Sequence, residues 1–271
     1  MSARLVLVGC ILSTVVASNL RAHAQDKAAA PAAATKAAAD DPRDTEIPEW
    51  TAEQATPAIA AFKNAWREAK TPDLKVSALD AFVKGRHSFV ADELAKLVKE
   101  KDDRVRVRAV VLLGTQKGVG AEKHLLPLCK FARNYDSVRG RAAVRSLGYI
   151  GYGKDGFKLL EDLFWKCSEP EVRAELAFAW GMQKEKRAFS ILVAMLDMPR
   201  PVDPNDPNNP PASYWEAIGA QWEVVKGPVA VALEQICGKK MFNKDAAERW
   251  FDDVGKKQGF KLERVEPVFK G

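Results

Sequence analysis

A fixed pattern of apolar, basic and small residues recurs along the middle of the chain. Each copy has a Val-Arg pair, then one or two alanines, and then a large apolar residue followed by glycine. The three clear copies run from Val105-Arg106 to Leu113-Gly114, from Val138-Arg139 to Leu147-Gly148, and from Val172-Arg173 to Trp180-Gly181. Their valines lie 33 and 34 residues apart, a period typical of stacked repeats.

Two weaker copies flank these three. An earlier, degenerate copy runs from Val76 to Gly85, and a later one runs from Val225 to Leu233 after a long insertion. The copy that starts at Val138 carries one extra residue before its glycine. The pattern therefore predicts about five units.

Each copy has the features of a helix. Thr71-Pro72 offers a cap and a first-turn proline, and Ser168 with Glu171 has the spacing of a capping box. Asp103 and Asp136 stand where a helix N-terminus favours carboxylates, and the glycine of each copy is expected to end its helix.

A second set of amphipathic segments lies between the copies. Their apolar residues are spaced by three and four positions, as the surface of a helix requires: Leu94, Leu97 and Val98; Leu125, Leu126, Leu128 and Phe131; Leu159, Leu160 and Leu163. No stretch alternates apolar and polar residues over a strand length. The sequence therefore predicts an all-α fold with two helices per unit.

With this pattern, the segment from Thr71 to Cys237 resembles the bacterial HEAT-like repeats that also occur in phycobilin lyases. The resemblance implies a right-handed α-solenoid of about five helical-hairpin repeats. In that family the arginine after the valine forms an internal ladder with acidic residues of neighbouring units. By this likeness Arg106, Arg139 and Arg173 are expected to be structural.

The N-terminal residues 1–24 have the order of a secretory signal peptide, with Arg4, an apolar run, and Ala22-His23-Ala24 before an expected cleavage at Gln25. The apolar run is too short to span a membrane. Lipidation at Cys10 is a weaker alternative, because the run continues beyond that cysteine. Residues 25–45, rich in Ala, Pro and Lys, are expected to be a disordered linker.

The rest of the chain is expected to hold the repeat array at 46–240 and a C-terminal capping segment at 241–271. The tail from Leu233 to Trp250 looks like the closing segment of some exported HEAT arrays. A proline-rich insertion at 198–212 interrupts the last repeat, and Ser213 with Glu216 predicts that a helix restarts there as a capping box.

Charge adds one candidate surface. Loss of the leader would leave 40 basic and 36 acidic side chains, which is too mild an excess to indicate nucleic-acid binding. Like-charged pairs at i,i+4 spacing nevertheless stand out in two copies: Arg104 with Arg108, and Arg141 with Arg145. Since the second helices of HEAT units line the inner curve, these arginines are candidates for binding an acidic protein partner. Neutralisation by nearby acids such as Glu171 and Glu175 is the alternative.

No catalytic, cofactor-binding or metal-binding residue is predicted. His87 and His124 lack a ligand partner at a recognised metal spacing and are expected to be surface histidines. The glycines from Gly151 to Gly156 match a dinucleotide-binding pattern but follow no strand, so a loop is expected. Asp203, Asn205 and Asp206 resemble the opening of a calcium loop that prolines interrupt.

Three cysteines would remain in the exported chain: Cys129, Cys167 and Cys237. All three lie among apolar neighbours in helical patterns, which favours buried free thiols over one disulfide with an odd thiol.

Taken together, these patterns favour a non-enzymatic scaffold for protein binding in the periplasm or outside the cell. A cofactor lyase or chaperone of the bilin-lyase type is the alternative, and a nucleic-acid-binding HEAT protein is the third hypothesis. Export speaks against the third hypothesis. The partner itself is not identified by the sequence.

Overall fold

The structure is a computed structural model of the 271-residue chain and describes residues 41–133, 137–201, 203, 206–265 and 269. The expected leader, residues 25–40 of the expected linker, Asp136 and Asn205 lie outside the described residues. The chain divides into two compact units, Met1–Asp44 and Thr45–Gly271. The described part of the first unit is a 3-10 turn at Pro42–Asp44.

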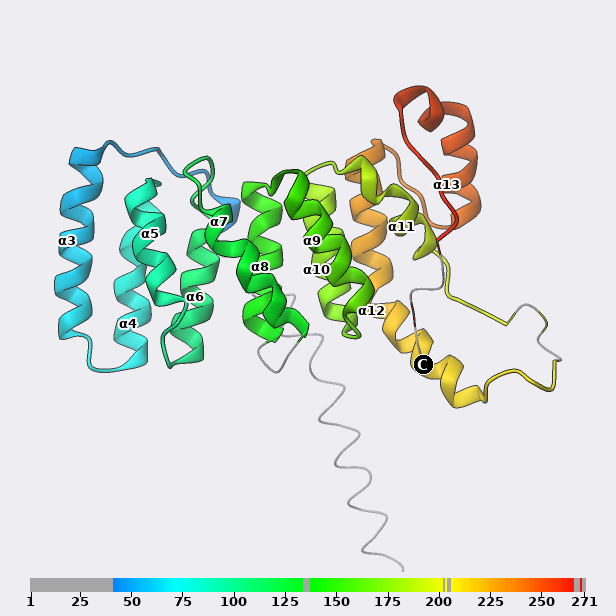
Figure 1. Ribbon diagram of the computed structural model, residues 1–271, viewed down its shortest axis with the longest axis horizontal. Coiled ribbons are helices and arrows are strands. Elements are labelled where there is room, and N and C mark those ends of the chain that lie inside the picture. Colours follow the sequence, from blue (N-terminus) through cyan, green and yellow to red (C-terminus); the bar gives the residue numbers. More distant parts are fainter. Residues whose placement is uncertain (1–40, 134–136, 202, 204–205, 266–268, 270–271) are drawn as a thin grey trace, which may run out of the picture. The chain divides into compact units, whose positions relative to one another are not determined.

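The second unit is an all-α solenoid of five successive helical hairpins (Figure 1). The first helices are α3 (Ala52–Glu68), α5 (Ser88–Leu97), α7 (Glu122–Leu125, continued by a 3-10 helix at Leu126–Arg133), α9 (Gly153–Lys166) and α11 (Phe189–Ala194). The second helices are α4 (Pro72–Leu79, continued at Asp80–Lys84), α6 (Asp103–Leu113), α8 (Ser137–Ile150), α10 (Pro170–Met182) and α12 (Ala212–Cys237). Among the described residues there is no strand, only an isolated bridge between Glu49 and Arg86.

The second helices form a continuous layer, in which α4 packs on α6, α6 on α8, α8 on α10, and α10 on α12. The large apolar residue of each repeat, Leu113, Leu147 or Trp180, is fully buried. Val138 instead is 54% exposed. Its copy has one extra residue before the buried leucine, and one residue rotates a side chain by about 100° around a helix.

The glycines of the pattern do not all end their helices, as the sequence suggested. Gly114 is the C-cap of α6. Gly148 and Gly181 instead lie inside α8 and α10, where a neighbouring backbone leaves no room for a side chain. A Cβ on Gly148 would stand 2.9 Å from the Ala179 Cα, and one on Gly181 would stand 2.8 Å from the Ala232 Cα. These two glycines permit close approach between second helices.

The helix starts follow the sequence in part. Thr71 caps α4 by accepting a hydrogen bond from the Leu74 backbone, as expected. The capping boxes expected at Ser168 and Ser213 are wrong. α10 begins at Pro170 and α12 at Ala212, and neither cap residue accepts a side-chain hydrogen bond. In both places a proline begins or precedes the helix and presets the backbone angle that a helix start needs.

The C-terminal segment closes the last repeat. After α12 the chain forms α13 (Lys244–Trp250), a π-helical turn at Phe251–Gly255 and a 3-10 turn at Lys256–Gln258. The ring of Phe189 on α11 lies 5.6 Å from that of Trp250 and 5.2 Å from that of Phe260. This aromatic cluster buries the end of the array.

Candidate interaction surface

The outward-facing side chains of α4, α6, α8, α10 and α12 form one surface, here called the second-helix face. It includes all four arginines proposed from the sequence, which form two pairs, each with a spacing of four residues, one helical turn. The structure places them on two adjacent helices, Arg104 and Arg108 on α6, and Arg141 and Arg145 on α8.

Three of the four arginines are paired with acids of an adjacent repeat. Arg104 Nη1 lies 2.6 Å from Asp73 Oδ1, and Arg108 Nη2 lies 2.5 Å from Asp80 Oδ1. The like charges on α6 are therefore neutralised by two acids on the preceding hairpin. This is the alternative that sequence reasoning kept open.

On α8 the two arginines differ. Arg145 Nη1 lies 3.1 Å from Glu175 Oε2 on α10, and its guanidinium carbon lies 4.2 Å from the centre of the Phe178 ring. Arg141 is half-buried and has no hydrogen bond or ion pair with any residue that the structure describes. It is the one candidate arginine whose charge stays available to a partner.

Next to Arg145 the face contains a groove of about 300 Å³ between α8, α10 and α12. Its lining combines Phe178, Pro228 and Val231 with the Arg145–Glu175 pair. Val231 is 53% exposed, so the groove presents an accessible apolar side chain beside Phe178 and Pro228. The groove therefore offers an apolar floor with a charged edge.

The groove also contains a hydrogen-bond acceptor that the described residues leave unsatisfied. Gln235 Oε1 is buried and has no hydrogen-bond partner. It lies over Gly181, where an added Cβ would stand only 2.3 Å away. A buried acceptor without a donor is destabilising by about 1–3 kcal/mol, so a side-chain rearrangement that brings a donor to this oxygen would be favoured.

The three ladder arginines lie in the first turns of the second helices α6, α8 and α10. Arg106 donates to the carbonyls of Glu100 and Lys101 and pairs with Asp103. Arg139 donates to the Val98 carbonyl at 2.9 Å. Arg139 thus binds the C-cap carbonyl of α5, and Arg106 binds carbonyls of the turn that follows α5.

Arg173 departs from the expected ladder with acids of neighbouring repeats. It is 4% exposed, donates to the Cys167 carbonyl at 2.8 Å, and has the rings of Phe164 and Phe269 within 6 Å. Its contacts are a carbonyl of its own repeat and aromatic rings, and burial lowers its pKa.

The other residues singled out from the sequence form no joint site. His87 caps α5 through its ring nitrogen, and His124 Nε2 lies 2.9 Å from Asp92. No group of three His, Cys, Asp or Glu residues within the described ranges is placed to hold a metal ion. The glycine run does not stay a loop throughout, because α9 begins at Gly153.

The cysteines Cys129, Cys167 and Cys237 are free thiols. Burial raises the pKa of all three, to about 12 for Cys129 and Cys237. Of the two possibilities that the sequence left open, the structure has the one without a disulfide.

Sequence reasoning missed the groove. Its floor is built by α12, whose repeat copy is degenerate, and the exposure of Val231 depends on how α12 packs against α10. One signal was Pro228, because a proline inside a helix removes a backbone hydrogen bond and marks an irregular helix at that position.

Comparison with known protein families finds that residues 90–181 match the model of HEAT repeats. The matched part runs from α5 to the end of α10 and includes all four candidate arginines. No similar curated protein and no similar solved structure was found. A search of the described helices for one long and apolar enough to cross a membrane finds none.

Proposed function

Because residues 90–181 match HEAT repeats, which generally serve as scaffolds for protein interactions, we propose that this chain is a non-enzymatic scaffold that holds a protein partner on its second-helix face. We further propose that it works in the periplasm or outside the cell, as the leader pattern at residues 1–24 suggests.

The groove beside Arg145 carries this proposal. It combines an exposed valine with a Gln235 oxygen that the described residues leave unsatisfied, and Arg141, unpaired among those residues, lies outside the groove lining, one helical turn before Arg145 on α8. The partner segment that fits would pack an apolar side chain against Val231 and place a carboxylate near Arg141. Apolar cores with a few directed polar contacts are typical of protein interfaces.

Site-specific photo-cross-linking in the native host tests the proposal. The photoreactive residue p-benzoylphenylalanine at Val231 should give one dominant cross-linked protein. The same residue at Phe242, which is 76% exposed but lies in the loop before α13, serves as the control. Equal cross-linking from both positions, or none from Val231, would contradict binding in the groove.

The location is tested separately. Mass spectrometry of the protein recovered from a periplasmic fraction should show a first residue of Gln25. An intact Met1, or a lipid on Cys10, would contradict the proposed export route.

A further inference from the structure

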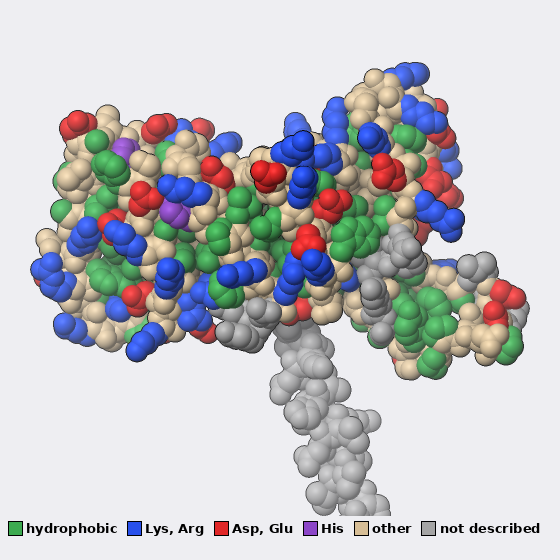
Figure 2. Space-filling view, in the orientation of Figure 1, with side chains coloured by type: hydrophobic (Ala, Val, Ile, Leu, Met, Phe, Trp, Pro, Cys, Tyr) green, Lys and Arg blue, Asp and Glu red, His purple; other side chains and the backbone are tan. Residues whose placement is uncertain are grey.

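A second hollow lies on the opposite part of the array, at the first helices α9 and α11. Its volume is about 650 Å³, within the range of cavities that hold small ligands. The far wall is an extended C-terminal stretch of residues 259–265. Figure 2 shows acidic, basic and apolar side chains gathered around this hollow, between the array and the C-terminal helix.

The C-terminal wall is fixed to α11 by hydrogen bonds. The Ser190 hydroxyl donates to the Lys261 carbonyl at 3.0 Å and accepts from the Glu263 backbone N–H at 3.0 Å. Lys186 donates to the Gln258 carbonyl at 3.0 Å, and Phe260 is part of the aromatic cluster. The pocket is therefore formed before any ligand binds.

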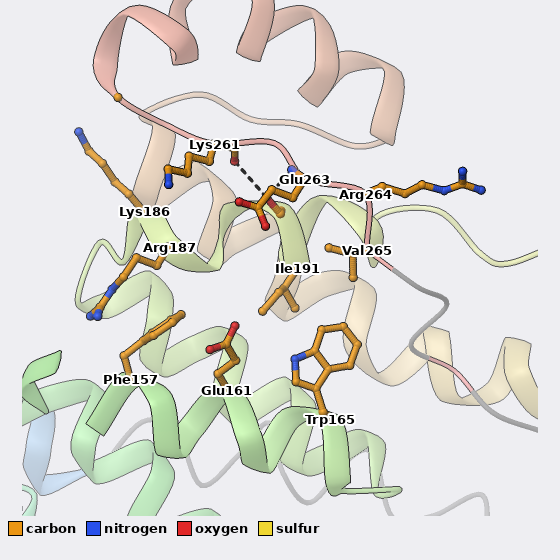
Figure 3. A pocket seen from close by; sticks show the side chains of 12 residues that line it. Phe157, Glu161, Trp165, Lys186, Arg187, Ile191, Lys261, Glu263, Arg264 and Val265 are labelled. Atoms are coloured by element: carbon orange, nitrogen blue, oxygen red, sulfur yellow. Dashed lines mark hydrogen bonds between the residues drawn. The ribbon is translucent and has the colours of Figure 1, made fainter. Parts of the chain in front are cut away.

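One face of α9 supplies the opposite wall. Phe157, Glu161 and Trp165 follow one another at four-residue spacing and all line the pocket. Trp165 is 42% exposed, which leaves much of its indole free for contact. Ile191 of α11 adds an aliphatic surface beside it (Figure 3).

Two carboxylates point into this space from opposite walls. Glu161 extends from α9 and Glu263 from the C-terminal stretch, and their carboxylates face one another across the pocket (Figure 3). Neither side chain has an ion pair or a hydrogen bond with any described residue. Glu161 attracts Arg187 electrostatically, but neither carboxylate is held in an ion pair or a hydrogen bond within the described part of the chain, so both oxygen pairs can accept hydrogen bonds from a bound cation.

The basic residues around the pocket do not fill it. Arg187 is held by the carboxylate of Glu185, with Nε 2.8 Å from Oε1, and its guanidinium lies over one face of Phe157. The side chains of Lys186 and Arg264 extend away from the space between the two glutamates (Figure 3). Arg187 is thus held by Glu185, and Lys186 and Arg264 point away from the two carboxylates (Figure 3).

From this geometry we propose that the pocket binds an organic cation with a guanidinium or primary ammonium head and a short apolar stem. The two carboxylates would accept charge-assisted hydrogen bonds from the head. The stem would lie against Trp165 and Ile191, and the indole face adds attraction for the cation. Such a site on the first helices is independent of the second-helix face and of the scaffold role proposed for it.

Four probes with similar stems test the head-group requirement: butylguanidinium, butylammonium, 1-butanol and pentanoate. The full chain is labelled with 5-fluorotryptophan, and fluorine NMR follows the resonance that Trp165→Phe removes. Both cations should shift this resonance saturably, and the alcohol and the carboxylate should not. Equal shifts with pentanoate, or no shift with either cation, would overturn the proposal.

Charge-removing variants identify the groups responsible. Glu161→Gln and Glu263→Gln should each weaken butylguanidinium binding by about tenfold, as the loss of one charge-assisted hydrogen bond predicts. Glu216→Gln, an exposed carboxylate on α12, is the matched control and should bind as the natural protein does. Melting temperatures confirm that the variants are folded. Unchanged affinity in both pocket variants would also overturn the proposal.

A capped Gly-Arg-Gly peptide then separates two sources of the same head group. Peptide binding that depends on Glu161 and Glu263 supports the proposal and assigns the cation to a protein side chain. Binding of butylguanidinium without binding of the peptide supports it equally and assigns the cation to a free small molecule.

Discussion

Gly148 on α8 lies directly against Ala179 on α10, so closely that a Cβ on the glycine would stand 2.9 Å from the Ala179 Cα. The ring of Phe178 would lie 3.1 Å from the same Cβ. A backbone atom cannot move aside without shifting its helix. We therefore predict that Gly148→Ala lowers the free energy of unfolding by about 1–3 kcal/mol, the usual effect of overpacking a core.

Gly219→Ala is the matched control for this variant. Gly219 also lies inside a helix, α12, but its nearest neighbour is the flexible methyl end of Met198, at 3.2 Å. Alanine favours the helix by about 0.5–1 kcal/mol over glycine, so this variant should be neutral or slightly more stable. Urea unfolding of both variants measures whether the contact with α10 or helix propensity determines the effect. Equal losses of stability would show that helix propensity, and not the contact with α10, governs Gly148.

The same pair of residues shows what the sequence could predict. The recurring glycine, in register with buried Leu147, correctly located the second helices. Its role was misread, because local sequence cannot distinguish a glycine that ends a helix from one that a neighbouring helix touches. The facing alanines Ala179 and Ala232 are the other half of each contact, and they become recognisable only once the repeats are stacked.

The acidic partners of these arginines could have been predicted from the sequence. Asp73 precedes Arg104 by 31 residues, Asp80 precedes Arg108 by 28, and Glu175 follows Arg145 by 30. These separations are close to one repeat, so the acids lie one hairpin away on the same face. The pocket at α9 could not be predicted, because its far wall is a non-repeating tail that reaches back to Ser190.

Burial of the thiols predicts that they are chemically inert in the folded protein. With the pKa of Cys129 and of Cys237 raised to about 12, the reactive thiolate is almost absent at pH 8. Iodoacetamide should leave both residues unmodified in the native protein and modify both after denaturation, as measured by peptide mass spectrometry. Rapid native labelling of Cys129 at pH 8 would contradict its burial.

The thiol of Cys129 also predicts a pH dependence of stability. Its pKa is raised from 9.0 to about 12 on folding, so the unfolded chain loses this proton first. The stabilisation by the neutral thiol is complete below pH 9 and is lost as the pH rises from 9 toward 12, by up to about 1.4 kcal/mol per pH unit.

Cys129→Ala removes this titration and isolates its effect. The variant should be less stable than the natural protein at pH 7.5, because it loses a buried side chain. The difference should become smaller at pH 10.5, since only the natural protein still loses stability through this thiol. A difference that stays constant between the two pH values in urea unfolding would show that Cys129 does not titrate as its burial implies.

The last prediction separates two arginines that the sequence presented as equivalent. Arg108 is paired with Asp80, so Arg108→Glu places two carboxylates side by side. Arg141 has no such partner, and its reversal also relieves the like-charge pair with Arg145. We predict that Arg108→Glu lowers the free energy of unfolding by about 1 kcal/mol and that Arg141→Glu leaves it unchanged.

For partner binding, Arg141→Glu should have the larger effect and Arg108→Glu the smaller one. If the partner places a carboxylate near Arg141, then Arg141→Glu should weaken the complex, mainly through a slower association that resembles the effect of added salt. Arg108→Glu should bind almost normally once the folded fraction is taken into account. Calorimetry and surface plasmon resonance on the two variants, with the partner identified by cross-linking, provide both measurements. An Arg141→Glu protein that binds with unchanged affinity would exclude this arginine from the interface and leave the apolar groove as the remaining contact.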